Sequence, residues 1–286
     1  MWAINKSPLI IGAPINAIKT PASSLAILGN KEVIAINQDP LGQQAQLIRR
    51  YTEEEWDVWA GNLSGSRMVV ALANWKNSSS CVSVDLGSVL GIASAKARDV
   101  WSGKEVGAIS GHYQKTLKGH QLHVLVLSDI VRAAAVPKPT EYYAAADAIL
   151  SGAATKVSCA SNQCLPSHRK VGNMGQGSGA AAVTFNNVIA ITDGRKLLGV
   201  DFINYDVALA SAWSGGTNTR NMTISVNSGR PKRWAFPISG GNWYETGRLM
   251  VEVDGLKAGD NNSVEFRAFG DGSWAPDLVG FEVFET

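Results

Sequence analysis

Apolar and polar residues alternate in short runs over much of the chain. In residues 43–128, such runs occupy 56–60, 68–75, 82–86 and 120–127. A period of two residues places every second side chain on the same face of a strand. Gly61-Asn62 is expected to form a turn, and Asp99–Lys104 is expected to be a strand that runs into one. About eight short strands with frequent turns predict a small antiparallel β-sandwich.

The same alternation continues in residues 142–286. Its runs occupy 180–185, 198–204, 221–226, 248–253 and 263–267. Gly, Asn and Ser separate these runs, and no helix of useful length is indicated, so a β jelly roll is the expected architecture. Residues 129–141 lose the alternation and carry Pro137 and Pro139, which is typical of a linker. The chain is therefore predicted to be mainly all-β.

The first 42 residues follow a different pattern. Pro8–Gly12 is a short apolar run that predicts a strand buried on both faces. Thr20-Pro21 predicts a helix start, and Ser23–Leu28 runs into Gly29-Asn30 as a stop. A strand buried on both faces needs parallel partners, which the rest of the chain does not offer. We expect residues 1–42 to be a remnant of a larger domain, and to be disordered, misplaced or aggregation-prone in the isolated chain.

Two N-terminal segments, Met1–Gly12 and Asn30–Gly42, closely resemble the family 27 α-galactosidases, as do the segments 99–104 (DVWSGK) and 117–128 (LKGHQLHVLVLS). The resemblance implies that residues 1–42 are the last strand and helix of a (β/α)8 barrel. It also implies that residues 43–128 are the family's C-terminal β-sandwich domain. The parent enzyme would hydrolyse terminal α-linked galactose, and its missing barrel domain would be a partner of this chain.

The catalytic aspartates of that family would precede Met1, and its Lys-Tyr-Asp-type strand end does not occur in this sequence. Asp39 is the tempting substitute, but a carboxylate before a proline in a turn commonly caps backbone N–H groups. Asp57 and Asp99 flank tryptophans on strands, with no second carboxylate nearby in the sequence. We assign no catalytic residue and expect the chain alone to be inactive.

The last 145 residues resemble the family 35 carbohydrate-binding modules, close kin of family 6, in the segments 143–148, 170–175, 240–247 and 275–279. In those relatives, two glutamates and an aspartate bind a structural calcium. The matching positions here are Ala144, Ala146 and Val279, which offer no carboxylate. We expect an apolar contact in place of the calcium site. Asp147 and Asp277 remain nearby, so a weaker site stays open.

The sugar-binding candidates are loop aromatics and polar residues beside them. Trp243 matches the family's Gly-Gly-Trp platform, and an aromatic face can stack on the C–H patches of a sugar. The further candidates are Asp277, Asn204, Trp213 and Trp274, with Arg220 and Asn221 more weakly placed. Any one of these tryptophans could instead be a lid over the core. Trp234 and Phe236 share one strand face and are expected in the core.

Composition and charge limit the classes of partner and the cellular compartment that fit this chain. A net charge of +2 without a Lys/Arg block argues against nucleic acid and anionic membranes as partners, and no apolar run is long enough for a membrane span. Cys159 and Cys164 are expected to form a loop disulfide rather than a metal pair, which leaves Cys81 over. No metal or cofactor is predicted. No signal peptide is apparent. Sequons occur at Asn5, Asn62, Asn77, Asn221 and Asn261, as chance alone can produce, and Asn5 is expected to be buried. Asn62 and Asn77 lie beside turn residues, which fits a secreted, glycosylated parent.

Three functions remain open from the sequence. The favoured one is a C-terminal part of an α-galactosidase that binds carbohydrate, such as α-galactosides or plant cell-wall polysaccharide, without catalysis. The first alternative is a stand-alone lectin-like binding protein. The second is a non-binding structural spacer.

Overall fold

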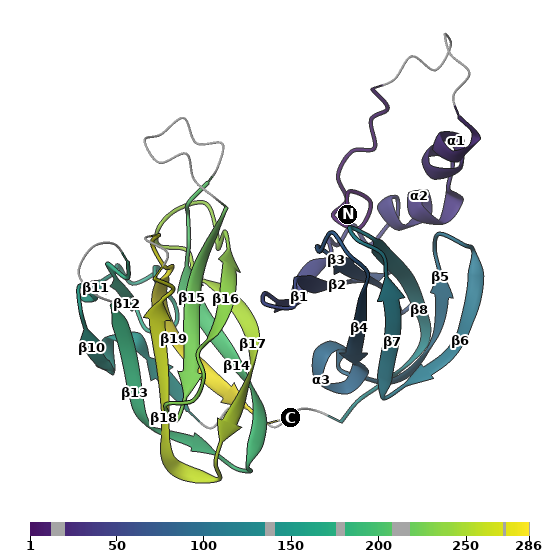
Figure 1. Cartoon of the computed structure of the whole chain (residues 1–286). Coiled ribbons are helices and arrows are strands. Elements are labelled where there is room, and N and C mark those ends of the chain that lie inside the picture. Colours follow the sequence, from purple (N-terminus) through teal and green to yellow (C-terminus); the bar gives the residue numbers. More distant parts are fainter. Residues whose placement is uncertain (13–20, 135–140, 176–180, 208–217, 271–272, 286) are drawn as a thin grey trace. The chain divides into compact units, whose positions relative to one another are not determined.

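The computed structural model describes residues 1–12, 21–134, 141–175, 181–207, 218–270 and 273–285 (Figure 1). The chain divides into two compact units. One consists of Met1–Arg49 with Glu55–Ala135, and the other of Arg50–Glu54 with Val136–Thr286. In both units most of the described secondary structure is β-strand, so the mainly all-β fold predicted from the alternation is confirmed.

Eight strands build the sandwich of the first unit. They are β1 (Gln46–Tyr51), β2 (Trp56–Leu63), β3 (Arg67–Asn74), β4 (Ser80–Asp85), β5 (Ile92–Asp99), β6 (Lys104–Ser110), β7 (His112–Leu117) and β8 (Leu122–Arg132). Six of them hydrogen-bond in the order β1-β2-β3-β8-β5-β6, and β4 pairs with β7. Strand β3 is central and apolar along nearly its whole length, because both of its faces are covered.

Three short helices accompany these strands: α1 (Ala22–Leu28), α2 (Lys31–Asn37) and α3 (Leu86–Leu90). Helix α1 confirms the predicted helix and ends at Gly29, whereas α2 was not predicted as a separate helix. Asn30 separates the two, because its side chain accepts hydrogen bonds from the backbone N–H groups of Glu32 and Val33, both at 3.0 Å. No helix in the described ranges is long and apolar enough to cross a membrane.

The N-terminal segment departs from its prediction in two ways. Pro8–Gly12 forms no strand, and Ile10 is 81% exposed, because no parallel neighbour supplies hydrogen-bond partners. The segment is also not wholly displaced. Ile4 and Ile36 are buried in a cluster with sandwich residues, and Val33 packs against that cluster. The expectation that the whole segment lacks a defined place is therefore wrong for these residues.

The predicted turn at Gly61-Asn62 is wrong as well. Strand β2 continues to Leu63, and the turn follows at Ser64–Ser66, where Gly65 and Ser66 adopt positive φ angles of 68° and 56°. Gly61 serves a different purpose, since a Cβ atom there would lie 2.8 Å from Cα of Ala45. The glycine marks a close approach of two backbones rather than a turn.

Two more boundaries in the first unit differ from the sequence reading. Strand β5 already ends at Asp99, so the turn takes in Val100–Gly103 before β6 begins. Strand β8 extends through Asp129–Arg132, the first residues of the predicted linker, and pairs there with β5. Residues 135–140 of that linker lie outside the described residues.

Two stacked sheets form the second unit. Their strands are β9 (Tyr142–Ala144), β10 (Ile149–Ser151), β11 (Thr155–Ser158), β12 (Arg169–Gly172), β13 (Ala182–Ala190), β14 (Gly194–Ile203), β15 (Thr219–Val226), β16 (Lys232–Pro237), β17 (Gly247–Leu256), β18 (Gly259–Ala268) and β19 (Asp277–Phe284). One sheet has the order β10-β13-β18-β15-β16 and the other β11-β12-β19-β14-β17, with β9 on β19. The short 3-10 helix η1 (Ala145–Asp147) is the only helix among the described residues of this unit. The predicted jelly roll is confirmed.

Aromatic side chains fill the space between these two sheets. Phe185 on β13 and Phe266 on β18 come from one sheet and meet Phe281 of β19 from the other, with ring centroids 4.9 and 5.3 Å apart from it. Trp234 and Phe236 are fully buried, as their shared strand face predicts. Aromatic packing across the sheets supplies a large part of the apolar area that this unit buries.

Asp39 anchors the end of the N-terminal segment to the β2–β3 turn. Its carboxylate accepts hydrogen bonds from the backbone N–H and hydroxyl of Ser64 (2.9 and 2.8 Å), from the Leu41 N–H (3.1 Å) and from Arg67 (3.2 Å). Burial acts to raise the pKa of Asp39, but the hydrogen bonds from Ser64 and Leu41 outweigh it and hold the pKa below its usual value. This geometry supports the structural reading of Asp39.

Replacing Asp39 by Ala should lower the stability of the first unit by about 2–3 kcal/mol, because hydrogen bonds to a buried charge are lost. Since the pKa of the carboxyl is lowered by folding, its contribution is present above the unfolded pKa and disappears as pH falls through the folded value. Urea unfolding at several pH values measures both effects, and hydrogen exchange in β2 and β3 shows that the first unit is the one affected. Lys96→Ala, which removes an exposed ion pair with Asp129 from strand β5, is the control. Equal losses in the two variants would contradict the prediction.

Candidate functional site

Four loops meet at one end of the second unit. They comprise residues 173–175, 204–206, 238–246 and 273–276, which we call the loop end. Backbone hydrogen bonds join them in pairs, from Ala275 N–H to the Met174 carbonyl (2.7 Å) and from Ser239 N–H to the Asn204 carbonyl (2.9 Å). Arg220 adds a contact from β15 to the carbonyl of Ala275 (3.3 Å). Loops held by a rigid scaffold are a frequent place for binding residues.

Trp243 lies in the loop between β16 and β17 and is half-buried. The guanidinium of Arg220 stacks 4.7 Å from the centroid of its indole ring, and the ring of Tyr205 meets it edge-on at 6.4 Å. Arg220 is itself held by Asp206, whose carboxylate accepts from the guanidinium Nε at 3.3 Å. Trp243 is therefore a fixed part of the loop end, with neighbours that restrict its ring.

The predicted disulfide supports the same tryptophan. Cys159 and Cys164 are joined by an S–S bond of 2.02 Å, which confirms the pairing, while Cys81 is free and exposed. Cys164 is buried in a small apolar cluster with Ile203 and Val279, against which Trp243 and Cys159 pack. The backbone N–H of Cys164 also donates to the carbonyl of Tyr244 (2.9 Å). The disulfide loop thus contacts both the core and the Trp243 loop.

Three aromatic side chains at the loop end are open to solvent. Tyr205, Tyr244 and Trp274 are 37%, 43% and 37% exposed. Trp274 was predicted as a candidate, and Gly175 allows its loop to approach, because a Cβ atom on Gly175 would lie 2.8 Å from Cα of Trp274. Tyr205 and Tyr244 were missed, although each directly follows a residue that was singled out. The predicted candidate Trp213 lies outside the described residues.

Asn204 is completely buried, and its side chain is engaged within the protein. Its amide N–H groups donate to the carbonyls of Phe236 (3.0 Å) and Pro237 (3.2 Å), and its amide oxygen accepts from the N–H of Asp206 (3.0 Å). The structure therefore places Asn204 as a brace between the end of β14 and the end of β16. We leave it out of the set proposed to contact ligand.

Asp277, predicted as a hydroxyl partner, forms an ion pair with Lys170 (2.7 Å) in which both side chains are largely buried. Burial raises the pKa of Asp277, although the Lys170 ammonium and the Arg220 guanidinium act in the opposite direction. The two weaker candidates, Arg220 and Asn221, differ in their position relative to the loop end. Arg220 belongs to the loop end, whereas Asn221 follows it directly on β15, and successive side chains of a strand point to opposite faces.

The residues at the three expected calcium positions do not fit a calcium ion. Ala146 and Val279 are buried, Ala144 pairs with Gly280 in β9–β19, and none carries a side-chain oxygen. The carboxylates that remain nearby are taken by cations, because Asp147 forms a two-pronged pair with Arg169 (2.8 and 2.9 Å). Asp277 is paired with the Lys170 ammonium through one of its oxygens. Val279 instead lies in an apolar cluster, as the sequence predicts.

The carboxylates considered in the first unit make structural hydrogen bonds. Asp57 is 1% exposed and accepts from the indole N–H of Trp75 (2.9 Å). Asp99 accepts from the backbone N–H groups of Trp101 (2.9 Å) and Ser102 (3.0 Å). Its second oxygen lies 3.5 Å from His123, whose burial lowers the pKa of the ring. These contacts fix turns and strand ends.

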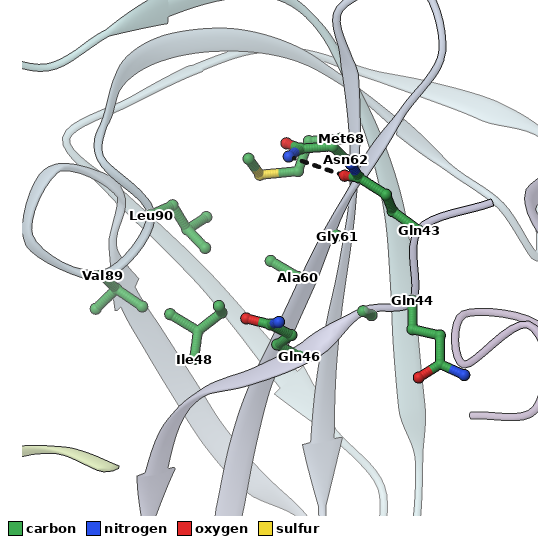
Figure 2. Close-up of a pocket in the computed structure, with 11 residues that line it drawn as sticks. Gln43, Gln44, Gln46, Ile48, Ala60, Gly61, Asn62, Met68, Val89 and Leu90 are labelled. Atoms are coloured by element: carbon green, nitrogen blue, oxygen red, sulfur yellow. Dashed lines mark hydrogen bonds between the residues drawn. The ribbon is translucent and has the colours of Figure 1, made fainter. Parts of the chain in front are cut away.

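A pocket of about 570 Å³ opens on the first unit (Figure 2). Four carboxamide side chains line it together with an apolar floor: Gln43, Gln44, Gln46 and Asn62, with Ile48, Met68, Val89 and Leu90 among the apolar residues. Asn62 donates to the side-chain oxygen of Gln43 at 3.4 Å, as the dashed line in Figure 2 marks. The lining offers no acid, base or nucleophile, so this pocket supplies no group for hydrolysis.

The sandwich of the first unit has a known counterpart. Residues 53–127 match the family model described as the alpha galactosidase C-terminal beta sandwich domain. Curated relatives match along almost the whole chain. The probable alpha-galactosidase D of Aspergillus flavus is 29% identical over 99% of this chain and 59% of its own length. The probable alpha-galactosidase D of Aspergillus fumigatus strain Af293 is 30% identical over 100% of this chain and 58% of its own length.

The chain carries the C-terminal β-sandwich domain of the α-galactosidases. The resemblance predicted from the sequence is thereby confirmed, since the chain combines this sandwich domain with a jelly-roll unit and is similar to curated alpha-galactosidases D along almost its whole length. It spans slightly under three-fifths of the length of the curated relatives that it matches. A family 35 carbohydrate binding module from Clostridium thermocellum is 28% identical over 51% of this chain and 99% of its own, with a TM-score of 0.44. A TM-score this low adds no argument.

Replacing Asn204 by Ala should destabilise the second unit by about 2–3 kcal/mol, because two buried carbonyls and one N–H lose their partner. Asn186→Ala on β13, where the asparagine is exposed, should change the stability by less than about 0.5 kcal/mol. Thermal unfolding of both variants, with hydrogen exchange in β14 and β16 to identify the unit, measures the difference. Similar midpoints for the two variants would count against the bracing role.

Proposed function

We propose that this chain binds neutral carbohydrate through the loop end and takes no part in catalysis itself. The observation that carries the proposal is the gathering of exposed aromatic rings around a rigidly held loop. Tyr205, Tyr244 and Trp274 are exposed to solvent, and Trp243 is held beside Tyr205 by Arg220 and the disulfide loop. Rings of this kind stack on the C–H faces of sugars while nearby polar groups set the orientation.

The charges at the loop end favour an uncharged ligand. Lys170 is paired with Asp277, and Arg220 with Asp206, so neither cation is left to attract an anionic substrate. Glu245 accepts hydrogen bonds from Gly241 and Asn242 within its own loop. The relatives named as alpha-galactosidases suggest the sugar class, namely α-galactosides such as the galactose branches of plant cell-wall polysaccharide.

Hydrolysis would require two carboxyl groups about 5 Å apart across the sugar, one free to act as nucleophile and the other as acid. Asp39, Asp57 and Asp99 are each engaged by backbone or side-chain donors that hold turns in place. We propose that catalysis in the parent protein belongs to a (β/α)8 barrel of which residues 1–42 are the last segment. Residues 43–128 would then be the sandwich, 129–141 the linker and 142–286 the binding module.

An apolar surface on the first unit supports this division. A groove of about 640 Å³ is lined by Trp2, Leu9, Ile10, Ile11, Ile27, Leu28, Ile34 and Trp101 among others. Ile10 and Trp2 are 81% and 71% exposed, which is unusual for a surface that meets only water. We propose that the missing barrel domain of the parent covers this face. The Cys159–Cys164 disulfide fits a secreted parent, because such bonds persist in oxidising compartments.

Binding to galactomannan should fall by about fivefold, near 1 kcal/mol, on Tyr205→Ala or Trp274→Ala, because each change removes a stacking face. Trp101→Ala, a tryptophan of similar exposure (44%) on the first unit, should bind as the unchanged chain does. Affinity electrophoresis measures the binding, and a chromogenic α-galactoside on the same samples tests for hydrolysis. Lack of binding by the unchanged chain would favour the spacer, and hydrolysis would contradict the non-catalytic reading.

Replacing Ile10 and Ile27 by Glu should raise the monomer fraction of this chain, because both are exposed in the apolar face and charge opposes its self-association. Analytical ultracentrifugation over a range of protein concentrations measures the change. Leu165→Glu, an exposed leucine (49%) of the second unit, is the matched control. If the control raises the monomer fraction equally, the apolar face has no special tendency to associate.

A further inference from the structure

Lys170 is a buried lysine at the foot of the loop that carries Trp243. Only 7% of its side chain is exposed, so its ammonium must find its partners within the protein. It lies 2.7 Å from the Asp277 carboxylate, donates to the backbone carbonyl of Trp243 at 2.7 Å, and sits 4.9 Å from the ring centroid of Tyr244. One cation therefore joins strand β12, strand β19 and the β16–β17 loop.

The strand register explains why the ion pair forms. Strands β12 and β19 are antiparallel neighbours, with Val171 opposite Leu278, so Lys170 and Asp277 come from adjacent strands near the loop end. Gly172 closes over the carboxylate, because a Cβ atom there would lie 3.2 Å from Oδ1 of Asp277. The carboxylate is thus enclosed by protein, and an enclosed charge needs a partner in contact with it.

The Trp243 carbonyl gives this pair a role beyond neutralising charge. A carboxylate alone could be satisfied by the ammonium, but the second hydrogen bond ties the ammonium to the loop backbone. Other hydrogen bonds of that loop are local, such as Tyr244 N–H to Asn242 (2.8 Å), or run to Cys164 in the disulfide loop and, from Ser239, to the Asn204 carbonyl. The Trp243 ring is also stacked by Arg220. Lys170 supplies the charge-assisted hydrogen bond from strand β12 to the backbone of Trp243.

The calcium ligands that the resemblance to family 35 implies are absent from this unit. Ala144, Ala146 and Val279 carry no oxygen ligand, and the carboxylate of Asp277 already holds a cation that belongs to the chain. We propose that the Lys170 ammonium is the positioning cation of the loop end: it fixes the loop that carries Trp243 and Tyr244 without a divalent metal. The inference rests on the proposed function only in assigning carbohydrate binding to that loop.

The test separates loop position from core stability. Lys170→Met leaves Asp277 buried without a partner and is expected to destabilise the whole unit. The double variant Lys170→Met/Asp277→Asn removes both charges, so the core should recover most of its thermal midpoint. The loop should not recover, because the Trp243 carbonyl still lacks its donor. Lys156→Met, at an exposed lysine on the neighbouring strand β11, is the control.

Hydrogen exchange reads the loop without any sugar. In the double variant, the amides of Cys164, Gly241 and Tyr244 should exchange about tenfold faster relative to the interior amides of β17 in the same sample. Wild-type protection of these three amides in the double variant would overturn the proposal. So would faster exchange at the same amides when the unchanged chain is treated with excess EDTA.

Binding supplies a second and separate readout. Affinity of the unchanged chain for galactomannan should be the same with EDTA and with added calcium, and lower in the double variant than in Lys156→Met. A requirement for calcium would overturn the proposal. If the unchanged chain binds no galactomannan, the proposed function fails, while the exchange measurement still decides whether Lys170 positions the loop.

Discussion

The loop end depends on one buried contact, the ion pair between Lys170 and Asp277 with the Trp243 carbonyl as third member. Loops beyond the last strand residues have no sheet hydrogen bonds to fix them, so other polar contacts must do so. Burying two charges is favourable only when their hydrogen-bonding capacity is met, and here the carbonyl helps to meet it. The Arg220–Asp206 pair and the disulfide loop add support to the same tryptophan from other directions.

The two units bury their apolar residues and fix their loops in different ways. In the first, a nearly continuous apolar strand, β3, is covered on both faces, and Asp39 ties the N-terminal segment to the sandwich through three donors, two on Ser64 and one on Arg67. That unit also keeps a broad apolar face exposed, which fits a surface normally covered by more protein. In the second, aromatic rings close the core, and the surface feature is a rigid cluster of loops.

Period-two alternation was enough to predict both β units, because one-sided burial forces that pattern on a strand. The pattern misled where a glycine does not mark a turn. Gly61 predicts a turn, but in the structure it lies within β2 and permits close packing on Ala45. Pro8–Gly12 has the composition of a buried strand but lacks partners to pair with. The cysteine pair was predictable because its members are close in sequence. The Lys170–Asp277 contact was not, since strand pairing brings together residues that are distant in the chain.

The central claim is that the loop end is the carbohydrate-binding surface of this chain. The most direct measurement is a titration of the ¹⁵N-labelled chain with a galactomannan oligosaccharide, followed by amide and indole chemical shifts. The chemical shift changes should be concentrated at Tyr205, Trp243, Tyr244 and Trp274, with the signals of the carboxamide pocket of the first unit unchanged. Shifts confined to that pocket, or none at saturating sugar, would contradict the claim.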